Sequence, residues 1–97
     1  MNIKRITTIV PVDYLEDCER CLRAAGVPGM TIDNVRGFGE HAHYFSADLL
    51  RSNVRIEVYV SEDRCEVGLD AIRCVAADTQ TTAGLLVIDT LDRVSDL

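Results

Sequence analysis

Hydrophobic and polar residues alternate most regularly over residues 54–60. In "VRIEVYV" the apolar positions Val54, Ile56, Val58 and Val60 are separated by Arg55, Glu57 and Tyr59. A period of two places successive side chains on opposite faces of a strand. The segment therefore predicts a strand with one buried face and one polar face.

Three other segments have strand-like patterns. "NIKRITTIV" (2–10) is rich in β-branched residues, and Pro11 ends it. "MTIDNVR" (30–36) predicts a second strand. "LLVIDTL" (85–91) is a continuous apolar run, which predicts a buried strand.

Between the first two strands, apolar residues recur at helical spacing. We expect Asp13 to cap this helix and Gly26 to end it, since glycine often follows a helix C-terminus. Its apolar face consists of Leu15, Cys18, Leu22 and Ala25.

A second helix follows the 54–60 strand. Ser61 is the expected N-cap, and Glu62 and Asp63 lie in the first turn, where acidic side chains are favourable. Its apolar face consists of Cys65, Leu69, Ile72 and Ala76. Residues 37–53 and 78–84 have no clear period and predict loops.

The predicted order is strand, helix, strand, strand, helix, strand. Two β-α-β halves in this order indicate an α+β fold, a ferredoxin-like βαββαβ sandwich in which an antiparallel sheet carries two helices on one face. The chain has 97 residues, the length of one domain, so we expect residues 1–97 to form a single domain.

Composition excludes some classes of function. The chain has 16 acidic and 10 basic residues, a net charge of −6 and no basic stripe, which argues against nucleic-acid binding. No apolar run is long enough to cross a membrane, and the N-terminus lacks the pattern of a signal peptide. We therefore expect a cytoplasmic protein that does not insert into membranes.

The stretch "GVPGMTIDNVRGFGEH" (26–41) resembles the signature of the PII signalling proteins, G-x-x-G-M-T-V-x-x-V-x-G-F-G. The matching residues are Gly26, Gly29, Met30, Thr31, Val35, Gly37, Phe38 and Gly39. "VRIEVYVSED" is similar to the family's third strand and the start of its second helix. The resemblance covers nearly the whole chain and weakens after residue 77.

This resemblance implies a homotrimer that binds a small effector in the clefts between subunits. It also implies a T-loop, at about 40–52, that docks on a target such as a membrane transporter or an enzyme. The residues implied at the ligand are Thr31, Gly37, Phe38, Gly39, Glu40, Glu57, Tyr59, Ala83, Gly84 and Leu85.

The chain departs from the family pattern at the positions that carry cations. Glu40 and His41 replace an arginine and a glutamine, Asn53 and Leu85 each replace a lysine, and Asp96 falls about where an arginine is expected. Losing three charge-assisted hydrogen bonds costs about 4–9 kcal/mol of binding free energy. The resemblance thus implies an adenine nucleotide with fewer phosphates than ATP: AMP, cyclic AMP or ADP.

Two other constellations have alternative interpretations. "CERC" (18–21) has redox spacing, but Cys18 lies on the apolar face of a helix, so buried cysteines are favoured there and at Cys65, and Cys74 is expected to be exposed. His41 and His43 would point the same way in an extended loop, yet two histidines make an incomplete metal site. No nucleophile–base pair is recognisable, so we expect no enzyme activity and no certain cofactor.

The sequence therefore predicts a PII-like regulatory protein with an adenine nucleotide effector. Two alternatives remain: a metal-responsive protein that uses His41 and His43, and a trimeric adaptor that binds no small molecule and blocks a transporter.

Overall fold

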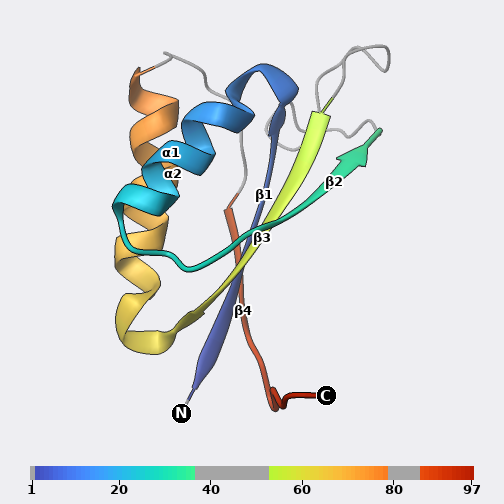
Figure 1. The fold of residues 1–97 in the computed structure, drawn as a ribbon, viewed down its shortest axis with the longest axis vertical. Helices are drawn as coiled ribbons and strands as arrows, with labels where there is room; N and C mark the ends of the chain where they lie inside the picture. Colours follow the sequence, from blue (N-terminus) through green and yellow to red (C-terminus); the bar gives the residue numbers. More distant parts are fainter. Residues whose placement is uncertain (1, 37–52, 79–85) are drawn as a thin grey trace.

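The computed structural model describes residues 2–36, 53–78 and 86–97 (Figure 1). In chain order these residues form β1 (Ile3–Pro11), α1 (Leu15–Ala24), β2 (Thr31–Val35), β3 (Asn53–Ser61), α2 (Cys65–Asp78) and β4 (Leu86–Thr90). The strands form one sheet in the order β2-β3-β1-β4, and every neighbouring pair is antiparallel. This is the ferredoxin-like βαββαβ arrangement that the sequence predicts.

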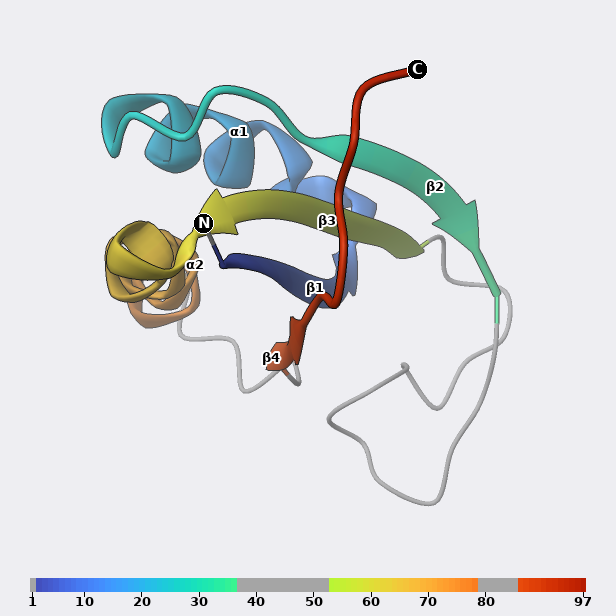
Figure 2. The ribbon, with the colours of Figure 1, turned by 90° about the horizontal axis from the view of Figure 1, so that it is seen from below.

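Both helices lie on the same side of the curved sheet (Figure 2). The core fills the space between these two layers. Its largest fully buried side chains come from β1, α1 and β3, and they are Ile6, Leu22, Ile56, Val54, Val58 and Cys18. Neither of the two described α-helices covers the opposite face of the sheet (Figure 2).

The pairing of the two central strands decides which side chains face the helices. Ile6 pairs with Val58 and Thr8 with Ile56, and all four side chains are at most 2% exposed. The alternate residues, which include Arg5, Glu57 and Tyr59, therefore lie on the face away from the helices. The alternation predicted over 54–60 is confirmed along β3.

The helix starts differ from the predicted caps. A 3₁₀ turn, Val12–Tyr14, precedes α1, and no side chain caps either element, so the prediction of an Asp13 cap is wrong. Ser61 does occupy the N-cap position before a second 3₁₀ turn, Glu62–Arg64, but makes no side-chain bond to the backbone there. α1 therefore begins at Leu15 and α2 at Cys65, each after one tighter 3₁₀ turn, which is a common form of helix N-terminus.

The end of α1 follows the prediction. Gly26 has φ of +81°, the left-handed conformation that glycine adopts without strain. The backbone N–H of Val27 then donates to the Leu22 carbonyl at 3.0 Å, which satisfies one of the carbonyls at the end of the helix. The chain turns here toward β2.

The last strand is not buried as the apolar run over 85–91 predicted. Among the described strands, β4 lies at the edge of the sheet and pairs with β1 alone, and Ile88 is 45% exposed. A continuous apolar run indicates burial on both faces only when neighbouring elements cover both faces. At this edge, Ile88 shares a row with Ile6 but lies beyond the cover of the helices.

None of the described helices is both long and apolar enough to span a lipid bilayer.

A matched pair of substitutions tests the core. Ile56 and Ile32 are directly opposite each other on β3 and β2, but Ile56 is 1% exposed and Ile32 is 41% exposed. We expect Ile56→Ala to lower the free energy of unfolding by about 2–5 kcal/mol, because it removes buried methyl groups and leaves a cavity. Ile32→Ala should cost less than about 1 kcal/mol. Urea denaturation at one fixed protein concentration measures both, and equal losses would contradict the assigned core.

Candidate functional site

An open groove with a volume of about 430 Å³ lies where the turn after α1 enters β2. Its lining residues are Pro28, Gly29, Met30, Thr31, Glu57 and Tyr59. Three of the residues predicted from the sequence to contact a ligand, Thr31, Glu57 and Tyr59, thus line one concave surface. Thr31 and Glu57 are 26 positions apart in the chain, and the β2–β3 register brings them together as a directly opposed pair.

Two ion pairs flank the groove on the face of the sheet away from the helices. Arg5 donates to Asp89 through Nη2 at 3.0 Å, and Arg55 donates to Asp33 through Nη2 at 2.6 Å. Each pair joins directly opposed residues on neighbouring strands. The hydrogen bond from Arg5 to Asp89, followed by the nearby Tyr59 hydroxyl, raises the pKa of Arg5.

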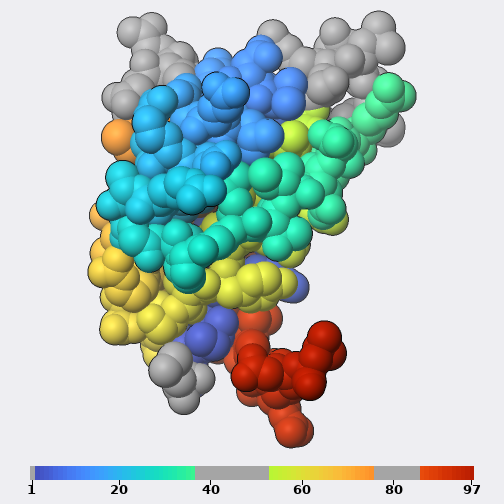
Figure 3. All heavy atoms as spheres, viewed as in Figure 1, coloured from blue at the N-terminus to red at the C-terminus, as the bar shows by residue number. Residues whose placement is uncertain are grey.

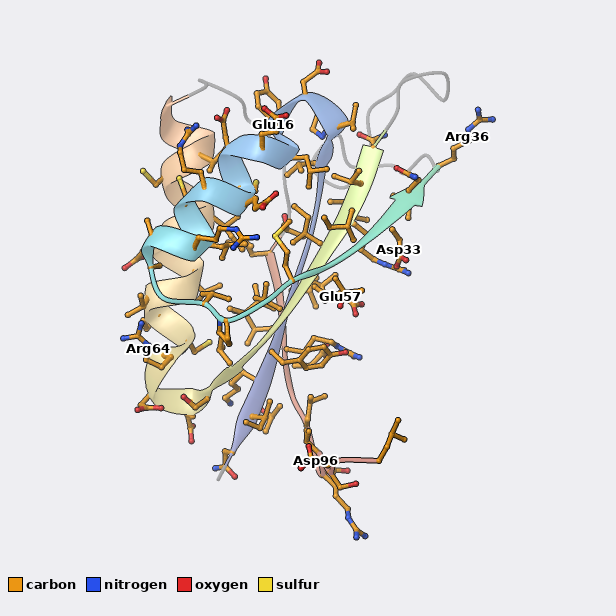
Figure 4. The ribbon with its side chains drawn as sticks, viewed as in Figure 1. Glu16, Asp33, Arg36, Glu57, Arg64 and Asp96 are labelled. Atoms are coloured by element: carbon orange, nitrogen blue, oxygen red, sulfur yellow. The ribbon has the colours of Figure 1, made fainter. Side chains whose placement is uncertain are left out.

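Along β3, Glu57 lies between Arg55, which pairs with Asp33, and Tyr59, which is directly opposite Arg5 on β1. Figure 4 shows Glu57 and Asp33. Among the described residues, the Glu57 carboxylate accepts no hydrogen bond from a protein side chain and keeps only a longer-range attraction to Arg5. Tyr59, two residues on, is 46% exposed. The groove therefore offers an aromatic face, a hydroxyl at Thr31 and a carboxylate with unused acceptors, a set suited to a flat heterocycle that bears an amino group.

The remaining predicted residues lie outside the part of the chain that the structure describes. They are Gly37, Phe38, Gly39, Glu40, His41, His43, Ala83, Gly84 and Leu85, and the predicted T-loop at 40–52 lies there too. Two positions that depart from the family pattern are described. Asn53 is buried at the start of β3, opposite Val35, and Asp96 is exposed in the C-terminal segment.

Three residues of the groove, Pro28, Gly29 and Met30, were not predicted. They form the turn between α1 and β2, and the Pro-Gly pair signals a turn in the sequence. A turn pattern alone gives no sign that its backbone borders a groove, because the opposite wall comes from β3. Sequence reasoning also missed Arg64, whose Nη2 donates to the Ala25 carbonyl at 2.6 Å across the α1–α2 junction.

The burial of the cysteines agrees with the prediction that Cys18 and Cys65 are buried and that Cys74 is exposed. Cys18 is 0% exposed and Cys65 is 8% exposed, while Cys74 lies on the exposed side of α2. Burial raises the pKa of Cys18 to about 11, and the neighbouring Cys21 adds to the shift. A thiol held protonated in this way does not serve as a redox nucleophile at neutral pH.

Among the described residues, no three His, Cys, Asp or Glu side chains lie close enough together to hold a metal ion.

Comparison with known families gives one match, which covers residues 3–95: the family model described as nitrogen regulatory protein P-II. Nitrogen regulatory protein GlnK of Escherichia coli strain K12 is 27% identical over 99 residues, which cover 95% of this chain and 88% of GlnK. Nitrogen regulatory protein P-II of Cereibacter sphaeroides is 26% identical to this chain over 99 aligned residues. The alignment covers 94% of this chain and 88% of the Cereibacter protein. The match extends beyond the residue 26–41 signature to both halves of the fold.

The high pKa of Cys18 gives a test by thiol labelling. At pH 8 a thiol of pKa about 11 is roughly 0.1% thiolate, so iodoacetamide should leave Cys18 unmodified in the native protein and label it after unfolding. Because folding favours the neutral thiol, the contribution of Cys18 to stability is full below pH 9 and is lost as the pH rises toward 11. Peptide mass mapping locates the label. Rapid native labelling at Cys18 would contradict its burial.

Proposed function

This chain belongs to the nitrogen regulatory protein P-II family, and we propose that its regulatory role depends on an adenine nucleotide bound between the subunits of a homotrimer. A regulatory, signalling role follows from the family itself. The identity of the effector, the trimeric assembly and the identity of the target protein are our proposals.

The observation that carries the proposal is the groove of Thr31, Glu57 and Tyr59. An exposed aromatic ring can stack on a purine, and such stacking contributes about 1–3 kcal/mol per base. The Glu57 carboxylate and the Thr31 hydroxyl can accept hydrogen bonds from an amino group such as the adenine N6. The groove is too open to enclose a base by itself, which supports a second subunit as the missing wall.

The number of phosphates follows from charge. The positions that carry cations in the family pattern hold Glu40, Asn53 and Leu85 here, and His41 stands where the family pattern has a glutamine. A γ-phosphate would therefore meet fewer donors and one carboxylate. AMP, cyclic AMP and ADP remain compatible with backbone N–H donors from the glycine-rich segments, because these ligands carry less charge.

The uncovered face of the sheet supports assembly into a trimer. A 97-residue chain folding alone buries a smaller fraction of its unfolded surface than a larger domain does, so association gains further burial. The flanking ion pairs Arg5–Asp89 and Asp33–Arg55 are 36–49% exposed and therefore remain accessible to a second subunit. We place the protein in the cytoplasm, where its target is a membrane transporter or an enzyme contacted through the loop at 40–52.

Light scattering tests the assembly. We expect a mass equal to three chains of 10.7 kDa at micromolar concentration. A stable monomer would remove the second wall of the groove, and with it the nucleotide site.

Calorimetry tests the effector. AMP, cyclic AMP or ADP should bind more tightly than ATP, with or without magnesium, because the cations for a γ-phosphate are absent from the sequence. If ATP binds most tightly, the proposed charge discrimination is wrong. If none of the four binds, the adaptor or the metal-responsive function becomes the better explanation.

Substitution of Tyr59 tests the groove itself. Tyr59→Ala should weaken nucleotide binding by about 1–3 kcal/mol, roughly 5- to 150-fold, because it removes the stacking surface. Val12→Ala is the control, since Val12 is similarly exposed but lies in the turn beyond the other end of β1. Unchanged affinity in the Tyr59 variant would show that the nucleotide binds elsewhere.

A further inference from the structure

A second, smaller hollow lies next to the groove, at the junction of three elements. It has a volume of about 140 Å³, and its lining residues are Gly26, Val27, Pro28, Tyr59, Val60, Ser61, Arg64 and Val67. The turn after α1 lies there against the end of β3 and the start of α2 (Figure 3). Pro28 and Tyr59 border both this hollow and the groove, so the two sites are neighbours that share part of their lining, and the other lining residues differ.

The walls of the hollow are mainly apolar. Val27, Val60, Val67 and the Tyr59 ring supply carbon surface, and Val67 is 38% exposed to solvent there. The size sets a limit on the ligand, because an apolar cavity of about 150 Å³ holds one benzene molecule. The hollow therefore suits a body of about four to six carbon atoms.

Arg64 gives the hollow one positive charge. Its Nη2 donates to the Ala25 carbonyl at 2.6 Å, which fixes the guanidinium against the end of α1 and uses one of its five N–H donors. A Cβ at Gly26 would lie 3.0 Å from the same nitrogen, so the glycine leaves room for the guanidinium. In the described part of the chain, no carboxylate lies within ion-pair distance of Arg64.

The two acidic residues beside Arg64 are engaged elsewhere. The Glu62 carboxylate accepts a hydrogen bond from Asn2 at 3.1 Å and lies 3.9 Å from the Lys4 ammonium. The Asp63 carboxylate accepts a hydrogen bond from the Ser61 hydroxyl, which lowers the pKa of Asp63, and a weaker longer-range attraction to Arg64 adds to the shift. Arg64 thus keeps N–H donors that, among the described residues, no carboxylate takes up in an ion pair.

We propose that this hollow binds a small monocarboxylate with a branched apolar body, whose carboxylate pairs with Arg64 and whose carbon atoms pack on Val27, Val67 and the Tyr59 ring. A guanidinium with unused N–H donors matches a carboxylate in charge and in geometry. A dianion or a phosphate would fit less well, because the hollow offers a single cation and mostly carbon surface. The site adjoins the nucleotide groove and shares Pro28 and Tyr59 with it, but Arg64, the partner of the carboxylate, lines only the hollow, so the proposal does not depend on nucleotide binding.

Isovalerate and isoamyl alcohol form a matched pair of probes, because they share the branched body and differ in the charged end. We expect isovalerate, titrated into the full chain, to shift the backbone amide NMR signals of residues 26–27 and 59–67 with a dissociation constant on the order of 1 mM. Isoamyl alcohol should bind at least tenfold more weakly. Absence of saturable shifts with isovalerate, or equal affinity for the alcohol, would overturn the proposal.

Two variants and one control locate the charge. Arg64→Gln should weaken isovalerate binding at least tenfold, while Arg73→Gln should leave it unchanged, because Arg73 lies on the same helix and pairs with Asp70 outside the hollow. Val67→Asp places a like charge in the hollow at an exposed position and should also abolish binding without relying on Arg64. Circular dichroism confirms that each variant is folded. Equal losses in the Arg64 and Arg73 variants would overturn the assignment, because the effect would then reflect net charge alone.

Discussion

The pairing of β1 with β3 is the constraint on which the other features depend. Nine residue pairs, from Ile3–Ser61 to Pro11–Asn53, hold the two central strands in a single register. This register turns Ile6, Ile56 and Val58 toward the helices and Glu57 and Tyr59 away from them. A slip by one residue would exchange the two faces, so that apolar side chains would lie on the open face and Glu57 in the core. Both the core and the groove therefore follow from one set of backbone hydrogen bonds.

The layer of helices adds a second constraint, which is the short distance between α2 and the sheet. At Gly68 an added Cβ would lie 3.2 Å from the Ile6 Cδ1, so α2 packs closely over the most buried residue of β1. Arg64 lies immediately before α2, where this layer meets the end of α1. The Arg64–Ala25 hydrogen bond then closes the junction between the two halves of the fold. The small hollow exists because a glycine turn and a helix start approach each other at this point.

The open face of the sheet has the character of a recognition surface. Its ion pairs are exposed, and exposed pairs contribute little to stability, about 0–1 kcal/mol each. These pairs engage Arg5 and Arg55. Between them, within the described part of the chain, Glu57 is a carboxylate with unused hydrogen-bond acceptors. Family membership explains why such a face matters, since a regulatory protein must bind something that changes its interactions. The chemistry of the face indicates what that ligand must offer.

The sequence by itself determined the order of the elements, the two faces of β3, the glycine end of α1 and the family, because each depends on local periodicity or on a contiguous motif. It placed Thr31, Glu57 and Tyr59 at a ligand through the resemblance, without showing that they share a surface. Only the tertiary structure decided that β4 is an exposed edge, since burial depends on which neighbours cover an apolar run. It also decided that a 3₁₀ turn rather than an Asp13 cap begins α1. The hollow beside Arg64 came from the tertiary structure too, because its walls are more than thirty residues apart in the chain and a concave surface between distant segments leaves no periodic signal.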